Sequence, residues 1–148
     1  MQNNVDLNEE PMEDIKPKLK VFYFKSRFGQ KVIEPELFRE FAGTNDQPDM
    51  LDFTSDRITF IRPGSFANLG LVKSFYFGDN RIRKIDANTF AGLTGLDELI
   101  LEENGINSIC WDDFYDFENL TKLQLSCNFL KEIETDTFIN LKSLETLR

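Results

Sequence analysis

The side chains that could bind a metal or react covalently are an acidic cluster and a serine–cysteine pair. Asp112, Asp113 and Asp116 offer carboxylates to a calcium ion, but the segment lacks the glycine and the twelfth-position glutamate of a calcium loop. We interpret the cluster as a solvated loop. Ser126 and Cys127 would need a base to become nucleophiles, and the sequence has no histidine, the commonest general base and metal ligand. The sequence therefore predicts no catalytic site, no metal and no cofactor, and the chain is not expected to be an enzyme.

The overall charge restricts the class of partner. The 148 residues include 17 basic and 26 acidic side chains, which give a formal net charge of -9. Such a chain is repelled by phosphate backbones and by anionic membrane surfaces. We predict no nucleic-acid partner and no direct membrane contact by this segment. The partner we do expect is a protein ligand, and the acidic bias of the outward strand positions favours one with a basic surface.

A sequence repeat determines the elements that would position any site. Its period is the spacing from Phe66 to Phe90, and it runs without a gap from Leu51 to Leu147. Three apolar columns recur at this period and in phase. They are Phe66, Phe90, Phe114 and Phe138; Ile58, Ile82, Ile106 and Leu130; and Ile61, Ile85, Ile109 and Ile133. Three such columns are not expected by chance, and they predict stacked coils whose apolar residues face one shared interior.

The repeat unit has a recognisable form. One unit reads Leu99-x-Leu101-x-x-Asn104-x-Ile106-x-x-Ile109 and continues as Phe114-x-x-Phe117-x-x-Leu120, and the next unit repeats it from Leu123 to Leu144. This resembles the leucine-rich repeat family, in the 24-residue class common in Toll-like receptors and extracellular matrix proteins. The resemblance implies an α/β-type repeat fold, a right-handed solenoid with a curved parallel sheet on its concave side. The convex side is then mostly loops and short helical turns.

Two kinds of residue are assigned structural roles. Asn80, Asn104 and Asn128 fall where the chain leaves each predicted strand, and a carboxamide both donates and accepts, so we expect them to bridge successive coils. Asp56 takes this place in the first unit and keeps only the acceptor, which indicates an irregular end coil. The phenylalanine column is expected to pack as a spine inside the solenoid.

Three regions follow from the pattern. Residues 1–17 are expected to be a disordered tail, and residues 18–49 a degenerate N-terminal coil with a strand at 21–24. Ile33 and Phe38 precede Ile61 and Phe66 by four residues more than one period, and residues 43–49 have the composition of a loop that could absorb them. Residues 50–148 hold four regular units and the start of a fifth. We expect this array to be C-terminally truncated and to belong to a longer chain.

The outward strand positions are the predicted interaction surface. They present an aromatic and an aliphatic anchor inside a charged rim, which is typical of a protein interface, although ordinary solvated strand residues would give the same pattern. The predicted patch centres on Tyr76 and Ile100 with Gln124 beside them. Its rim consists of Glu98, Glu102, Asp79, Glu103, Arg57 and Arg81.

Function and compartment remain open between alternatives. Cys110 and Cys127 occupy different repeat positions and are predicted to be free thiols, which favours a reducing compartment. The family resemblance favours a secreted or cell-surface protein instead, although a signal peptide and cysteine caps are not found. The leading hypothesis is a recognition module from an extracellular immune or cell-surface receptor. The alternatives are a scaffold that spaces a longer chain, and a regulatory region of a protein with a separate catalytic domain.

Overall fold

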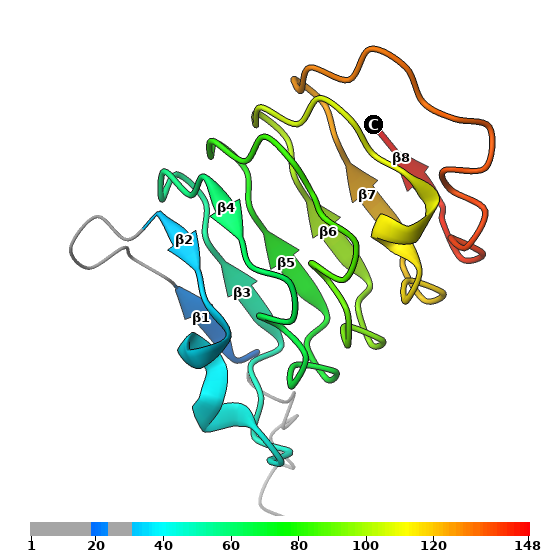
Figure 1. Cartoon of the computed structure of the whole chain (residues 1–148). Coiled ribbons are helices and arrows are strands. Elements are labelled where there is room, and N and C mark those ends of the chain that lie inside the picture. Colours follow the sequence, from blue (N-terminus) through cyan, green and yellow to red (C-terminus); the bar gives the residue numbers. More distant parts are fainter. Residues whose placement is uncertain (1–18, 24–30) are drawn as a thin grey trace, which may run out of the picture.

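Six short strands, one from each successive coil, form a parallel sheet along one side of the molecule (Figure 1). The computed structural model describes residues 19–23 and 31–148. In sheet order, the strands are β1 (Val21–Tyr23), β3 (Met50–Asp52), β5 (Ser74–Tyr76), β6 (Glu98–Ile100), β7 (Lys122–Gln124) and β8 (Thr146–Leu147). Each strand has only two or three residues and cannot bury its apolar side alone, so the coils depend on their neighbours.

The register of this sheet equals the period of the sequence. Leu51, Phe75, Leu99 and Leu123 lie opposite one another on neighbouring strands, and each is one repeat period from the next. These side chains point inward and are fully buried, as expected for alternate residues of a strand with one face in a core. The predicted solenoid with a parallel sheet is therefore confirmed.

The first coil is longer than the others. Strand β2 (Val32–Ile33) pairs in parallel with β4 (Phe60–Ile61), and Ile33 lies opposite Ile61, a separation four residues longer than one repeat period. The 3₁₀ helix η2 (Pro35–Phe41) follows β2, and irregular chain leads from it to β3. The expectations for residues 1–17 and for Phe24 lie outside the described residues.

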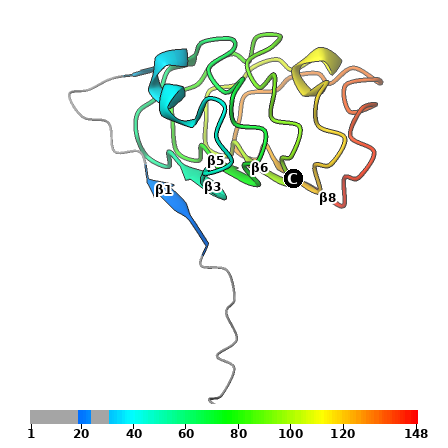
Figure 2. The ribbon, with the colours of Figure 1, turned by 90° about the horizontal axis from the view of Figure 1, so that it is seen from below.

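Helical structure among the described residues is limited to two 3₁₀ helices, η2 and η3 (Trp111–Phe114). Figure 2 shows both on the side of the coils opposite to the sheet. Loops and turns make up the rest of that side, so the helical contribution to this repeat is small. No helix in the part of the chain that the structure describes has the length and apolar character needed to cross a membrane.

The phenylalanine rings pack along the solenoid, and at one place a ring from outside the column links two of its members. Phe66 and Phe90 stack with ring centroids 6.1 Å apart and an interplanar angle of 8°. Phe90 is connected to Phe114 through Phe117, whose centroid lies 5.8 Å from that of Phe90 and 6.2 Å from that of Phe114. Phe138 contacts Phe114 at 5.9 Å and is only half-buried, because its coil packs on one neighbour. Phe117 is thus a member of the spine that the column alone did not identify.

The last coil is less buried than its columns predict. Ile133 is 50% exposed, whereas Ile61, Ile85 and Ile109 in the same column are buried. Leu130 is half-buried in the same coil. The expectation that every member of these columns faces the shared interior is therefore wrong for Ile133, because a second neighbouring coil does not cover it.

The asparagines hydrogen-bond to two coils at once. Asn104 accepts a hydrogen bond from the Ile82 backbone N–H (3.0 Å) and donates to the carbonyl of Phe77 (2.8 Å), both in the preceding coil. It also donates to Leu101 in its own coil (3.2 Å). Asn80 and Asn128 repeat these three contacts. Each carboxamide therefore satisfies backbone groups that the turn leaves without partners.

The chain turns out of β3, β5, β6 and β7 through a left-handed residue that is not glycine. Ser55, Asp79, Glu103 and Cys127 occupy this position in successive coils, with φ between 52° and 62°. A side chain in this region costs free energy that the surrounding structure must offset. In the last three units the residue immediately precedes the asparagine, so the turn directs the carboxamide inward and leaves its own side chain at the rim of the sheet.

Candidate functional site

The outward face of the sheet, called the sheet face below, carries a polar network across three strands. The Tyr76 hydroxyl on β5 donates a hydrogen bond to Oε2 of Glu98 on β6, at 3.0 Å. The other carboxylate oxygen of Glu98 lies 3.9 Å from Nζ of Lys122 on β7. Adjacent strands therefore hold the tyrosine ring in a defined orientation above the sheet.

The phenol of Tyr76 stays protonated. Partial burial raises the pKa of Tyr76 above its usual value, and the hydrogen bond to Glu98 and the charges of Glu98 and Asp52 raise it further. The hydroxyl thus remains a donor at neutral pH. It satisfies one oxygen of Glu98, and the tyrosine itself is half-buried.

Ile100 does not fit its expected role as an open anchor. In the sheet register Ile100 lies between Tyr76 and Gln124, and its neighbours cover it, so that only 8% of the residue is exposed. The accessible centre of the face consists instead of half-buried Tyr76 and Gln124. With so little of it exposed, this isoleucine contributes packing within the sheet more than contact surface.

The rim of the sheet face is charged and accessible. Asp79 and Glu103 are exposed at left-handed turn positions, and Arg57 and Arg81 are exposed nearby along the chain. Asp79 also accepts a hydrogen bond from the Ser55 hydroxyl of the preceding coil, at 2.7 Å. Glu102 is half-buried. Most of the predicted rim residues are thus accessible, and the carboxylates among them outnumber the basic groups.

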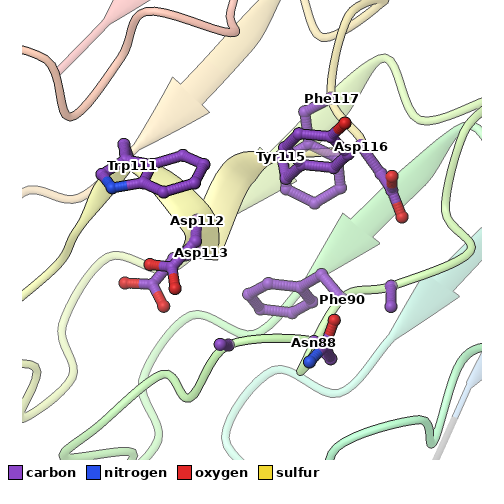
Figure 3. Close-up of a pocket in the computed structure, with 10 residues that line it drawn as sticks. Asn88, Phe90, Trp111, Asp112, Asp113, Tyr115, Asp116 and Phe117 are labelled. Carbon is purple, nitrogen blue, oxygen red and sulfur yellow. The ribbon is translucent and has the colours of Figure 1, made fainter.

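A pocket lies on the opposite side of the solenoid, between two consecutive coils. It has a volume of about 390 Å³ and draws its lining from the coil of Phe90 and from η3 and the residues after it (Figure 3). Trp111 and Tyr115 form its open walls, with ring centroids 6.5 Å apart. Phe90 and Phe117 are buried beneath them. Sequence reasoning missed this pocket because it depends on side chains of different size at equivalent positions of two coils.

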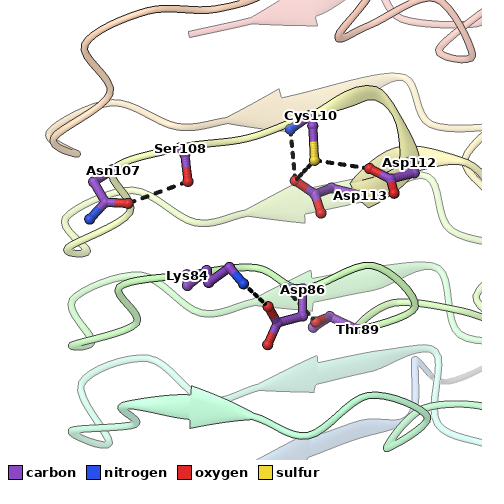
Figure 4. Close-up of polar contacts among 8 residues, drawn as sticks. All are labelled: Lys84, Asp86, Thr89, Asn107, Ser108, Cys110, Asp112 and Asp113. Atoms are coloured by element: carbon purple, nitrogen blue, oxygen red, sulfur yellow. Dashed lines mark hydrogen bonds and ion pairs between the residues drawn. The ribbon is translucent and has the colours of Figure 1, made fainter.

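The residues before and within η3 form a compact group of polar side chains (Figure 4). Asp113 accepts a hydrogen bond from the Cys110 backbone N–H at 2.8 Å, and the Cys110 thiol donates to Asp112 at 2.9 Å. The interpretation of the acidic cluster as a solvated loop is wrong for Asp113, which is only 5% exposed. Its carboxylate is buried because it caps the start of the 3₁₀ helix.

The two cysteines are both free, and we predict that they differ in reactivity. The hydrogen bond to Asp112 and partial burial raise the pKa of Cys110 to about 12, so almost none of it is thiolate at neutral or mildly alkaline pH. Cys127 is exposed at a turn. Iodoacetamide at about pH 8 should therefore alkylate Cys127 more than about tenfold faster than Cys110, as followed by peptide mass spectrometry. Equal rates in the folded protein would contradict this, and equal rates in urea are the internal control.

Comparison with known proteins gives the same repeat. A sequence profile described as leucine rich repeat matches residues 49–106 and 94–148. Among solved structures, the chain is similar to a chain of the LRIM1/APL1C complex and to the APL1 leucine-rich repeat domain, each with a TM-score of 0.73 and 30% sequence identity. The alignments cover 80% of this chain but 21% and 30% of those chains, so this chain spans less than a third of either. Comparison with curated proteins gives no match.

Proposed function

The chain belongs to the leucine-rich repeat family, and on that premise we propose that it is a protein-binding recognition module whose ligand lies on the sheet face. The fold itself is one that proteins use for interaction, and one of the similar structures is a complex. We extend the proposal to a segment of an extracellular immune or cell-surface receptor. The support for the receptor assignment is the resemblance of the repeat to the class found in such receptors.

The observation that carries the proposal is the Tyr76–Glu98–Lys122 network. Tyrosine is enriched among the residues that dominate binding energy, and here its ring is already held by a neighbouring strand. An ordered side chain loses less conformational entropy on binding than a free one. The surrounding carboxylates of Asp79, Glu102 and Glu103 favour a basic partner surface and faster association at low salt.

The test compares two double variants that remove similar groups from opposite sides. Tyr76→Ala with Glu102→Ala alters the sheet face, and Ile139→Ala with Glu134→Ala alters exposed side chains away from it. A protein retained by the unmodified chain from an extract of its source is identified by mass spectrometry, and its affinity for all three chains is measured by surface plasmon resonance. We expect the sheet-face variant to weaken binding by about tenfold or more and the control by less than about twofold.

Either of two results would contradict the sheet-face proposal. One is unchanged affinity in the Tyr76 and Glu102 variant. The other is an equal loss in both variants, which would mean that the substitutions act on the stability of the chain as a whole. Circular dichroism of all three chains before the binding measurement separates the second case from a true loss of contact.

A further inference from the structure

The pocket beside η3 exists because one coil has small side chains where the next has large ones. Ala87 and Ala91 occupy the repeat positions that Trp111 and Tyr115 occupy one coil later, and all four line the pocket. The preceding coil therefore offers no side chain of matching size at these two positions, and among the aromatic rings that the structure describes the two contact only each other's edge. Trp111 is 48% exposed and Tyr115 is 63% exposed, although large aromatic residues usually gain most from burial.

The same pocket is lined by three carboxylates. Figure 3 shows Asp112 and Asp113 next to Trp111, and Asp116 near Tyr115 and Phe117. Asp116 accepts a hydrogen bond from the Gly92 backbone N–H at 3.0 Å. Asp112 accepts one from the Cys110 thiol. Aromatic walls with adjacent carboxylates form an environment that attracts a cation.

Asp113 has a carboxyl group that its structural role does not require. The equivalent positions of the other regular coils hold buried hydroxyl residues, namely Ser65, Thr89 and Thr137. Thr89 accepts a hydrogen bond from the Asp86 backbone N–H at 3.0 Å, three residues earlier. Asp113 makes the same contact to Cys110 through one oxygen, Oδ2. A threonine hydroxyl is thus sufficient for the turn.

The second oxygen of Asp113 has no hydrogen-bond partner, although it is buried. The Thr137 hydroxyl in the last coil is also unpartnered, but a neutral hydroxyl costs less to desolvate than a carboxylate oxygen. Burial raises the pKa of Asp113, and the backbone hydrogen bond from Cys110 opposes that effect. Among the described residues, no lysine or arginine forms an ion pair with Asp112, Asp113 or Asp116.

Lys84 does not supply the missing charge. Its ammonium pairs with Asp86, which is the first cause of its raised pKa, and the charges of Asp113 and Cys110 contribute less (Figure 4). The solenoid therefore presents an aromatic pocket with a buried carboxyl group that forms no ion pair within the described part of the chain. A cationic group from another molecule would complete it.

We propose that this pocket binds an arginine side chain of a partner protein, with the guanidinium paired to Asp112 near the buried carboxyl of Asp113 and its plane on the rings of Trp111 and Tyr115. Guanidinium is the cation that pairs with carboxylates through two parallel hydrogen bonds and also stacks on aromatic faces. The volume of about 390 Å³ accommodates a side chain of that size. This site is separate from the sheet face and goes beyond the function proposed for that face.

A divalent metal ion in this pocket would account for fewer of its features than an arginine side chain. The sulfur of Cys110 and oxygens of Asp112 and Asp113 lie within 4.8 Å of one another, a spacing that a metal could bridge. Such an ion would have to displace the proton of a thiol whose pKa is raised to about 12. It would also leave the exposed faces of Trp111 and Tyr115 without a role.

The test uses the fluorescence of Trp111, which is the only tryptophan of the chain and therefore reports on this pocket alone. The full chain is titrated at constant ionic strength with the peptide Gly-Arg-Gly and with its citrulline analogue, which has the same shape and no charge. We expect a saturable change with the arginine peptide, and binding about tenfold or more weaker with the citrulline peptide.

Three variants make the assignment specific. Asp113→Thr installs the residue that Thr89 provides one coil earlier, so the fold is retained while the carboxylate is removed, and we expect arginine binding to fall about tenfold or more. Tyr115→Ala, at an exposed position, should also weaken it. The matched control is Asp136→Asn, because Asp136 is the exposed equivalent of Asp112 in the next coil. It should leave binding unchanged.

Several outcomes would overturn the proposal. These are an equal response to arginine and citrulline, unchanged arginine binding in Asp113→Thr, and a response to zinc or calcium chloride without one to the arginine peptide. Retained binding in the Tyr76 and Glu102 double variant is expected, because those side chains lie on the sheet face. Failure of the sheet-face proposal would therefore leave this result unaffected.

Discussion

Replacing Asn104 by alanine is expected to lower the free energy of unfolding by about 3–5 kcal/mol, because several buried backbone groups lose their partner together. The carboxamide accepts from Ile82 N–H at 3.0 Å and donates to the carbonyls of Phe77 and Leu101 at 2.8 and 3.2 Å. Alanine can replace none of these contacts, and the site is too buried for water to do so freely. Urea denaturation followed by circular dichroism measures the change.

Two further substitutions separate this mechanism from a general cost of removing an asparagine. Asn119 is exposed and donates one hydrogen bond, to Thr94, so Asn119→Ala should cost no more than about 1 kcal/mol. Asn104→Asp keeps the acceptor for Ile82 and loses both donors, so its effect should be as large as that of alanine or larger, through burial of a charge. If Asn104→Ala and Asn119→Ala were equally mild, the asparagines would not be bridging the coils.

The elements of this fold could be predicted because the period of the sequence and the register of the sheet have one cause. A coil that returns to the same place after one repeat period brings each residue above its equivalent in the previous coil. Leu99, Phe75 and Leu123 therefore align both in the sequence columns and in space. Only the first coil departs from this, by the four residues that separate Ile33 and Ile61 beyond the usual interval.

The parts that could not be predicted depend on differences between coils. Ser55, Asp79, Glu103 and Cys127 share a left-handed backbone, but their side chains have nothing in common and none is glycine, so composition gave no signal. Ile100 has the alternation of an outward residue and is nevertheless covered by its neighbours in the adjacent strands. In both cases the conformation or burial of the residue depends on its contacts with the neighbouring coil.

Asp113 shows the same limit at the level of a single site. Among the neighbouring acids of the sequence it resembles a solvated loop residue, whereas its column of Ser65, Thr89 and Thr137 identifies a buried cap. The same holds for the pocket walls, because Trp111 occupies the repeat position that Ala87 occupies one coil earlier. Comparison along the columns, and not along the chain, could have revealed both the burial and the excess charge.

Truncation of Phe66 to alanine should be the most damaging single change in the spine, at about 3–5 kcal/mol. Its ring centroid lies 5.6 Å from that of Phe38, 4.9 Å from Phe75, 5.9 Å from Phe77 and 6.1 Å from Phe90. The cavity would therefore open between the irregular first coil and the regular array. Denaturation midpoints give the size of the effect, and hydrogen exchange gives its location.

The same substitution at Phe138 is the matched comparison, because that residue is half-buried and contacts the single ring of Phe114. We expect Phe138→Ala to cost about 1–2 kcal/mol. In a solenoid each coil is stabilised mainly by its neighbours, so Phe66→Ala should raise hydrogen exchange in β2, β3 and β4 while β7 keeps its protection. Phe138→Ala should affect the region of β7 and β8 instead. Equal costs for both substitutions, or a loss of protection that spreads evenly from β2 to β8, would show that the coils unfold as one unit and that stability is not a sum of neighbouring contacts.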